Sequence, residues 1–213
     1  MDGLLIDTEP HWQVVEKEVL GKVGVKLNDE MQALTLGLRG DEQISFWYRK
    51  QPWDNPDFKA LERKYNDAMV EYFKTGGAEL MEGAVEALNF FSKKGLPLAL
   101  ASSSTMKLIN TFLDKFKLHH YFTEVYSAET ESHGKPHPAV FLETARRLNT
   151  EPVNCLVLED SFHGMIAAKA ARMKTLVVPD KRYITNPMFG AADMKLATLN
   201  DLTEEVFHQL NQN

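Results

Sequence analysis

The sequence contains a single cysteine, Cys155, among 213 residues. One cysteine excludes an internal disulfide framework, the usual support of small secreted domains. Long apolar runs are also missing, because no stretch approaches the roughly 18 residues that a membrane-spanning helix needs. The first residues lack the basic region, apolar stretch and cleavage site of a signal peptide. We therefore expect a cytoplasmic protein with no membrane partner.

An excess of positive charge is absent too. The chain has 30 acidic and 24 basic residues, for a formal net charge of −6. This balance gives no reason to expect a nucleic-acid partner. With 44% hydrophobic and 25% charged residues, the composition is typical of a globular protein. The length suits one large domain or a core domain with an insertion, and we take a monomer as the default.

Helical spacing dominates the first third of the chain. In "PHWQVVEKEVLGKVGV" and "DFKALERKYNDAMVEYFK", apolar residues recur three or four positions apart, which is typical of amphipathic helices. Glycines follow both stripes, Gly24 after the first and Gly76-Gly77 after the second. The first stripe comprises Trp12, Val15, Val19, Leu20 and Val23, and the second comprises Phe58, Leu61, Tyr65, Met69 and Phe73.

After Met81 the pattern changes to helices that alternate with short apolar runs. The runs lie in "LPLALASSS", "YFTEVYSAE", "NCLVLEDS" and "KTLVVPD". Uninterrupted apolar strands between helices predict a parallel sheet that is covered on both faces. The predicted fold is therefore an α/β, Rossmann-like core formed by residues 1–9 and 78–213, with an α-helical cap inserted at residues 10–77.

Reactive side chains follow three of the predicted strands. Ser102 ends one strand, Lys135 lies in the loop after the next, and Glu159-Asp160 end a third. Each has an ordinary structural interpretation: a helix cap, a solvated lysine and an exposed acid pair. In open α/β sheets, however, ligands bind beyond the carboxyl ends of the strands. There a hydroxyl and an ammonium suit a phosphate, and paired carboxylates suit Mg²⁺. Together these residues indicate a phosphate-handling site.

The ordered segments "DGLLIDTE", "LALASSS", "GKPHP" and "VLEDSFHG" resemble the haloacid dehalogenase-like phosphatase superfamily, in the subgroup with a helical cap. The cap segments "TLGLRG" and "WYRKQPW" are most similar to the branch of 2-deoxyglucose-6-phosphatases and hexitol phosphatases. The resemblance implies Mg²⁺-dependent hydrolysis of small phosphate esters, such as sugar or sugar-alcohol phosphates.

The resemblance also implies roles for individual residues. It makes Asp2 and Lys135 catalytic, with Asp2 as general acid and base. It assigns phosphate binding to Ser102, Ser103 and Lys135, and Mg²⁺ binding to Asp2, Glu159 and Asp160, with Glu159 as a direct ligand or as a partner of one.

Substrate choice should come from the cap, because the core is expected to contact only phosphate and metal. Arg39 in "LGLRG" is the main candidate, reaching toward a phosphate or hydroxyl group. His11 and Trp12 lie next to the hinge and are further candidates. The alternatives are a surface position for Arg39 and a packing role for Trp12.

In this family the first strand ends in Asp-x-Asp-Gly, and the first Asp attacks phosphorus. Met1 occupies the x and is followed by Asp2-Gly3, so the attacking Asp is expected one position before Met1. We therefore expect the 213-residue chain alone to be poorly stable and nearly inactive.

The sequence leaves three alternatives to the phosphatase function. One is a sugar phosphomutase like β-phosphoglucomutase, although such enzymes tend to carry a lysine at the position of Thr105. Another is a non-catalytic binding protein with the same fold. Dehalogenation is a remote third, because dehalogenases have no use for the Mg²⁺ that Glu159 and Asp160 suit.

Overall fold

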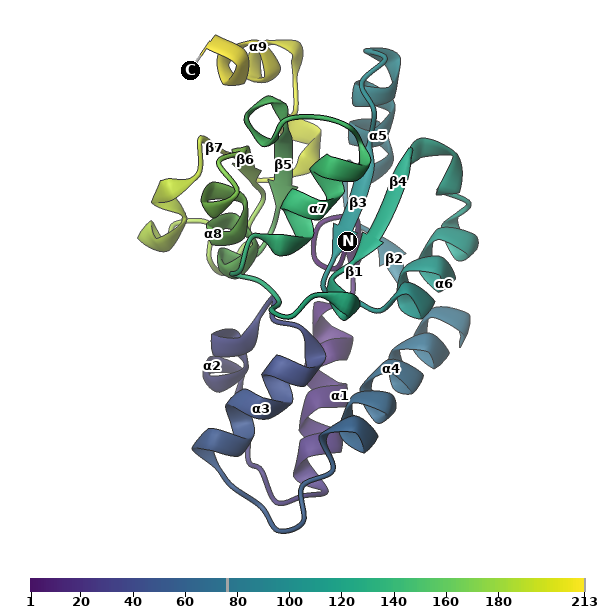
Figure 1. Ribbon diagram of the computed structural model, residues 1–213, viewed down its shortest axis with the longest axis vertical. Helices are drawn as coiled ribbons and strands as arrows, with labels where there is room; N and C mark the ends of the chain where they lie inside the picture. Colours follow the sequence, from purple (N-terminus) through teal and green to yellow (C-terminus); the bar gives the residue numbers. More distant parts are fainter. Residues whose placement is uncertain (76, 213) are drawn as a thin grey trace.

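The helices and strands fall into two groups. The computed structural model describes residues 1–75 and 77–212. Helices α1 to α4 lie together at one end of the molecule, and the strands lie with helices α5 to α9 at the other (Figure 1). Within the described ranges, no helix is both long enough and apolar enough to cross a membrane.

The first group contains the amphipathic helices that the sequence predicts. Buried residues of both predicted stripes face inward, including Leu20 of the first and Met69 of the second. α4, the helix that carries the second stripe, packs against α1, α3 and α6. The predicted stop at Gly76 lies outside the described residues. The bounds are α1 Glu9–Gly21, α2 Asp29–Gln32, a 3-10 turn at Ala33–Thr35, α3 Gly40–Lys50 and α4 Phe58–Thr75.

The second group alternates short strands with helices, as predicted. Its strands are β1 Ile6–Asp7, β2 Glu79–Leu80, β3 Ala99–Ser102, β4 Glu124–Ser127, β5 Leu156–Glu159, β6 Lys174–Val177 and β7 Met194–Lys195. Its helices are α5 Ala84–Lys93, α6 Met106–Phe116, α7 Ala139–Arg147, α8 Phe162–Ala170 and α9 Glu204–Gln212.

In the part of the chain that the structure describes, the strands form three separate sheets. β1 and β2 pair antiparallel, whereas β3–β4 and β5–β6–β7 are parallel. In the parallel sheets Ser102 lies opposite Ser127, and Glu159 lies opposite Val177. The α/β class with parallel strands is thus confirmed. This register places Ser102 and Glu159 at the carboxyl ends of β3 and β5.

The predicted single sheet is interrupted between β3 and β5. Among the described residues no strand pairs with the second edge of either strand. A mainly apolar cavity of about 490 Å³ lies between them. Its walls include Ala101 of β3, Leu158 of β5, Phe91 of α5 and Phe141 of α7, and Met1 also lines it. This cavity separates the two unpaired strand edges.

The N-terminal segment packs against the second group of elements. Met1 is buried, and the Gly3 amide donates to the Ile6 carbonyl at 2.9 Å. Gly3 has a φ of +69°, and a Cβ there would come within 2.0 Å of the Asp160 carboxylate. Glycine therefore allows the Asp2 loop to lie against the end of β5.

Candidate active site

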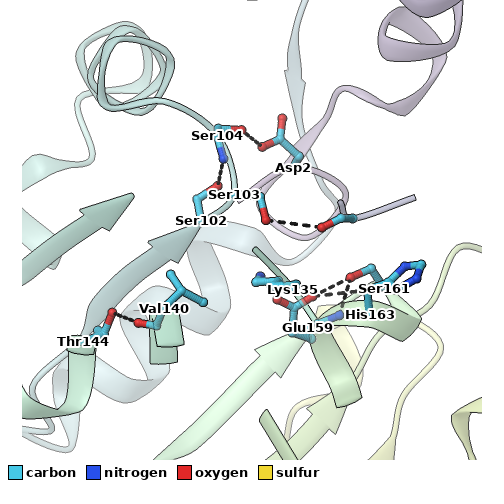
Figure 2. Close-up of polar contacts among 12 residues, drawn as sticks. Asp2, Ser102, Ser103, Ser104, Lys135, Val140, Thr144, Glu159, Ser161 and His163 are labelled. Atoms are coloured by element: carbon cyan, nitrogen blue, oxygen red, sulfur yellow. Dashed lines mark hydrogen bonds and ion pairs between the residues drawn. The ribbon is translucent and has the colours of Figure 1, made fainter. Parts of the chain in front are cut away.

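A cavity of about 130 Å³ lies between the helices of residues 10–75 and the carboxyl ends of the parallel strands. It collects side chains that are far apart in the sequence. Figure 2 shows several of them at the ends of β3 and β5. The sequence-predicted site residues that line it are Asp2, Arg39, Ser102, Ser103, Lys135, Glu159 and Asp160.

The serine run at the end of β3 forms a tight turn. Ser102 is buried, and its hydroxyl oxygen accepts the Ser104 amide at 3.1 Å. Ser102 does not cap helix α6, whose N-cap residue is Thr105, and it lines the cavity. Ser103 donates to the Gly37 carbonyl at 3.3 Å. Ser104, for which no sequence pattern predicts a role, donates to the Asp2 carboxylate at 2.7 Å.

The Asp2 carboxylate accepts hydrogen bonds from both groups of elements, the helical group and the group that contains the strands. Its Oδ1 accepts the Thr8 hydroxyl at 2.8 Å and the Trp12 indole N–H at 3.1 Å. Its Oδ2 accepts the hydroxyl of Ser104. Both carboxylate oxygens are thus held by donors, so the orientation of this side chain is fixed. Trp12 belongs to the packing stripe and also contacts the site.

Lys135 and Glu159 form a buried ion pair at the floor of the cavity. Both residues are nearly excluded from solvent, at 5% and 6% exposure. Burial opposes ionisation of Glu159, but the Lys135 ammonium, the N-terminal ammonium of Met1 and the Ser161 hydroxyl together outweigh it and lower the Glu159 pKa. Ser161 donates to the Glu159 carboxylate through its hydroxyl at 3.1 Å. A Cβ at Gly164 would lie 2.1 Å from that carboxylate, so glycine lets helix α8 pass close to it.

Asp160 follows Glu159 in the chain and lines the same cavity. The whole residue is half-buried, but its carboxyl group is enclosed by protein. Burial and the negative charge of Glu159 raise the Asp160 pKa to about 8. Over residues 1–75 and 77–212, no three His, Cys, Asp or Glu side chains form a ready-made metal cluster. The three predicted metal ligands therefore lie around one cavity but do not converge on one point.

Arg39 lines the cavity, and its guanidinium is bound to other residues of the protein. Its guanidinium forms a bidentate pair with Asp41, at 2.6 and 2.8 Å. The same group donates to the carbonyls of Ala128 and Glu131, both at 2.7 Å. These partners come from the loop after β4, so Arg39 fastens the helical group to the core. These contacts could not be predicted, because a loop carbonyl 92 positions away leaves no pattern in the sequence. A contact between Arg39 and the substrate stays a prediction.

His11 lies outside the cavity lining. Its ring stacks on Tyr72 with centroids 3.8 Å apart. Burial lowers the His11 pKa, which favours the neutral ring in this stack. The expectation that His11 lines the cleft is therefore wrong for this arrangement, because α1 turns the side chain toward α4.

Comparison with known proteins gives consistent family matches. Residues 1–178 match the family model of haloacid dehalogenase-like hydrolases. Hexitol phosphatase B of Escherichia coli (strain K12) is 40% identical over 205 residues, which cover 95% of this chain and 91% of that protein. Fructose-1-phosphate phosphatase YqaB of the same organism is 30% identical over 180 residues, covering 84% of this chain and 93% of that one.

Solved structures share the fold at lower identity. β-Phosphoglucomutase from Clostridium difficile superposes with a TM-score of 0.85 at 22% identity, over 99% of this chain and 94% of its own. CbbY from Rhodobacter sphaeroides, solved in complex with phosphate, gives a TM-score of 0.84 at 24% identity, over 95% of this chain and 93% of its own. At these identities the similarity concerns the fold.

Proposed function

Because the chain belongs to the haloacid dehalogenase-like hydrolase family, we propose that it hydrolyses phosphate monoesters of sugars or sugar alcohols. The observation that carries this proposal is that Ser102, Lys135 and Asp2 line one cavity although they are far apart in the sequence. Phosphatases at 40% and 30% identity support the reaction class and the substrate class. In this proposal residues 10–77 form the cap, and residues 1–9 and 78–213 form the core.

The phosphate group binds at the ends of β3 and β5. Lys135 supplies positive charge to the phosphoryl oxygens, while its pairing with Glu159 holds the ammonium in place. The Ser102 oxygen already accepts an amide, so its hydroxyl hydrogen can donate to the phosphate. Ser103, next in the same turn, adds a backbone amide. Stabilising phosphoryl charge with fixed donors is the main task of an enzyme in this reaction.

The acids at the end of β5 fit Mg²⁺. This ion needs only one or two carboxylates and keeps several of its waters, so a cluster of three is not required. Asp160 is an enclosed carboxyl with a neighbouring negative charge, and a bound cation would offset its raised pKa. Asp160 and the Asp2 segment would hold the ion, while Glu159 orients Lys135. When bound, Mg²⁺ supplies charge that neutralises the phosphoryl oxygens.

Asp2 acts as general acid and base in this proposal. Its carboxylate is held by Thr8, Trp12 and Ser104 at the junction of cap and core. From that position it protonates the departing alkoxide and later takes a proton from water. The attacking carboxylate is expected one position before Met1, where it would form an aspartyl phosphate.

The cavity favours hydrolysis over the mutase alternative. A phosphomutase has to bind a second phosphate, which calls for further cationic side chains. Among the described residues that line the cavity, the cations are Lys135 and Arg39. Arg39 is already bound to Asp41 and to two carbonyls. Thr105 stands where such mutases tend to carry a lysine, and it also lines the cavity.

A phosphate-release screen tests the proposal. Sugar and sugar-alcohol monophosphates are offered, with Mg²⁺ and after chelation, to the 213-residue chain and to a chain extended before Met1 by an apolar strand ending in Asp. We expect Mg²⁺-dependent release by the extended chain only. A matched extension ending in Asn should be inactive. A folded, extended chain that releases phosphate from none of the esters would contradict the enzyme and favour a binding protein.

A further inference from the structure

Two buried polar atoms on the cap side of the cavity have no protein partner. They are the Tyr65 hydroxyl and the Gln32 side-chain carbonyl oxygen. Neither atom has a hydrogen-bond partner in the parts of the chain that the structure describes. Tyr65 is 1% exposed and Gln32 is 4% exposed. Both residues line the same cavity as Ser102 and Lys135. Burying a polar group without a hydrogen bond is costly, so each such atom calls for an explanation.

The orientation of the Gln32 amide is fixed by its neighbours. Its nitrogen donates to the Gln13 carbonyl at 2.9 Å and to the Glu16 carboxylate at 2.6 Å. Because both partners are acceptors, the nitrogen end of the amide has to face them. The carbonyl oxygen is therefore turned away from Glu16, and it can only accept a hydrogen bond.

Glu16 in turn fixes this wall of the cavity. The residue is 3% exposed, and its carboxylate also accepts the Trp47 indole N–H at 2.8 Å. Gln43 donates to Thr35 at 3.3 Å beside it. The wall is a connected set of hydrogen bonds on α1, α3 and the segment between them. Such a network holds the Gln32 oxygen in one position.

The charge of this wall disfavours a phosphate and suits neutral hydroxyls. Its lining includes the carboxyl groups of Glu9, Glu16 and Glu62. Arg39 also lines the cavity but is paired with Asp41, and Lys135 lies at the core end. An anion would be repelled by the carboxylates and would find no donor at the Gln32 oxygen. An alcohol can donate to that oxygen and can exchange a hydrogen bond with the Tyr65 hydroxyl. The two ends of the cavity therefore suit the two ends of a polyol monophosphate.

We propose that Tyr65 and Gln32 form a hydroxyl-binding subsite that receives the uncharged polyol end of a phosphate monoester held at its other end by Ser102 and Lys135. This inference rests on the proposed function. Tyr65 also lies close to the proposed proton-transfer group, because its ring packs edge-on against Trp12 at 6.3 Å and Trp12 donates to Asp2. A polyol chain bound at Tyr65 and Gln32 would thus be aligned with the phosphate ester group that reacts.

Isothermal titration with two ligands tests the subsite. A hexitol 6-phosphate and ethyl phosphate, which lacks the hydroxyls, are titrated in the presence of Mg²⁺ into the full chain and into the Tyr65→Phe and Tyr48→Phe variants. Tyr48 is the matched control, because it packs against Trp53 and Phe58 in the cap and lies outside the cavity lining. The readout is the ratio of the two affinities.

We expect the wild-type chain to prefer the hexitol phosphate by about tenfold or more, from two or more added hydrogen bonds. Tyr65→Phe should lower this ratio about 3- to 10-fold, and Tyr48→Phe should leave it unchanged. An unchanged ratio in Tyr65→Phe, with both esters still bound, would overturn the subsite and leave the proposed function standing. Failure of both esters and of inorganic phosphate to bind would overturn the proposed function, and the subsite with it.

Thermal unfolding of the free protein gives a second readout. If Tyr65 keeps its hydroxyl for a ligand, Tyr65→Phe removes an unpaired buried group and should raise the melting temperature by about 2–6 °C. A purely structural role for the hydroxyl predicts a fall instead. A fall in melting temperature would therefore count against the subsite.

Discussion

Replacing Lys135 by methionine isolates the energetic role of the buried ion pair. Methionine keeps much of the length of the side chain but removes the ammonium that faces Glu159. Both residues are at most 6% exposed, so the Glu159 carboxylate would lose its compensating charge inside the protein. Breaking a buried pair in this way costs about 3–5 kcal/mol. That is a large part of the ~5–15 kcal/mol that stabilises an ordinary domain.

A double-mutant cycle in urea, at pH 7 and without metal, measures this coupling. Lys135→Met and Glu159→Gln should each be strongly destabilising, because each leaves one group of the pair without its partner. The double variant should recover at least ~2 kcal/mol relative to the sum of the single variants. If each single variant lost less than ~1 kcal/mol and the two losses simply added, the buried pair would be contradicted, since water would then reach both groups.

The same cycle has a pH dependence whose sign follows from Glu159. Its pKa is lowered from the ordinary value of 4.5 in the folded protein. The pair therefore stabilises the protein fully above about pH 4.5, and this contribution is lost as the pH falls through the lower folded pKa. The deficit of Lys135→Met should shrink over this range, because a protonated Glu159 no longer needs the ammonium. A deficit that stays constant as the pH falls would contradict the assignment.

Further expectations concern the cap and the apolar cavity. Arg39→Ala should lower the free energy of unfolding in urea by about 1–3 kcal/mol, since loop carbonyls lose their donor, whereas exposed Arg146→Ala should change it by less than ~0.5 kcal/mol. Gly37→Ala should cost about 1–3 kcal/mol, because φ is +81° and a Cβ would meet a serine hydroxyl at 2.5 Å; helical Gly21→Ala, with nothing within 4 Å, should not destabilise the protein. An apolar strand added before Met1 should raise the free energy of unfolding by roughly 1.5–3 kcal/mol per buried side chain; no gain over a Gly/Ser extension of equal length would contradict this.

Local patterns predicted much of the fold. The runs that became β3 and β5 are uninterrupted and apolar, so their strand character and parallel arrangement could be inferred without long-range information. The same argument placed Ser102 and Glu159 at neighbouring strand ends, and the structure has them around one cavity. Helical spacing predicted that Tyr65 and Met69 would be buried.

Contacts between distant segments could not be predicted. The Arg39 partners lie in a loop after β4, and no spacing rule connects the two. The short β1–β2 pair spans two residues per strand, which is too little for a periodic pattern. The helical stripe correctly predicted that the Tyr65 ring is buried, but not that the residue lines the cavity or that its hydroxyl lacks a partner among the described residues. These contacts depend on how the helices, strands and loops pack against one another after they form.

The proposed phosphate site is tested most directly by the binding of inorganic phosphate, measured by isothermal titration with and without Mg²⁺. We expect one phosphate per chain, with an affinity that rises when Mg²⁺ is present. Lys135→Met should weaken this binding at least about tenfold, which corresponds to ~1.4 kcal/mol. Lys169→Met, which removes a lysine paired with Asp193 at the surface, should leave it unchanged. Absence of phosphate binding, or equal binding by both variants, would contradict the assignment of this cavity as a phosphate site.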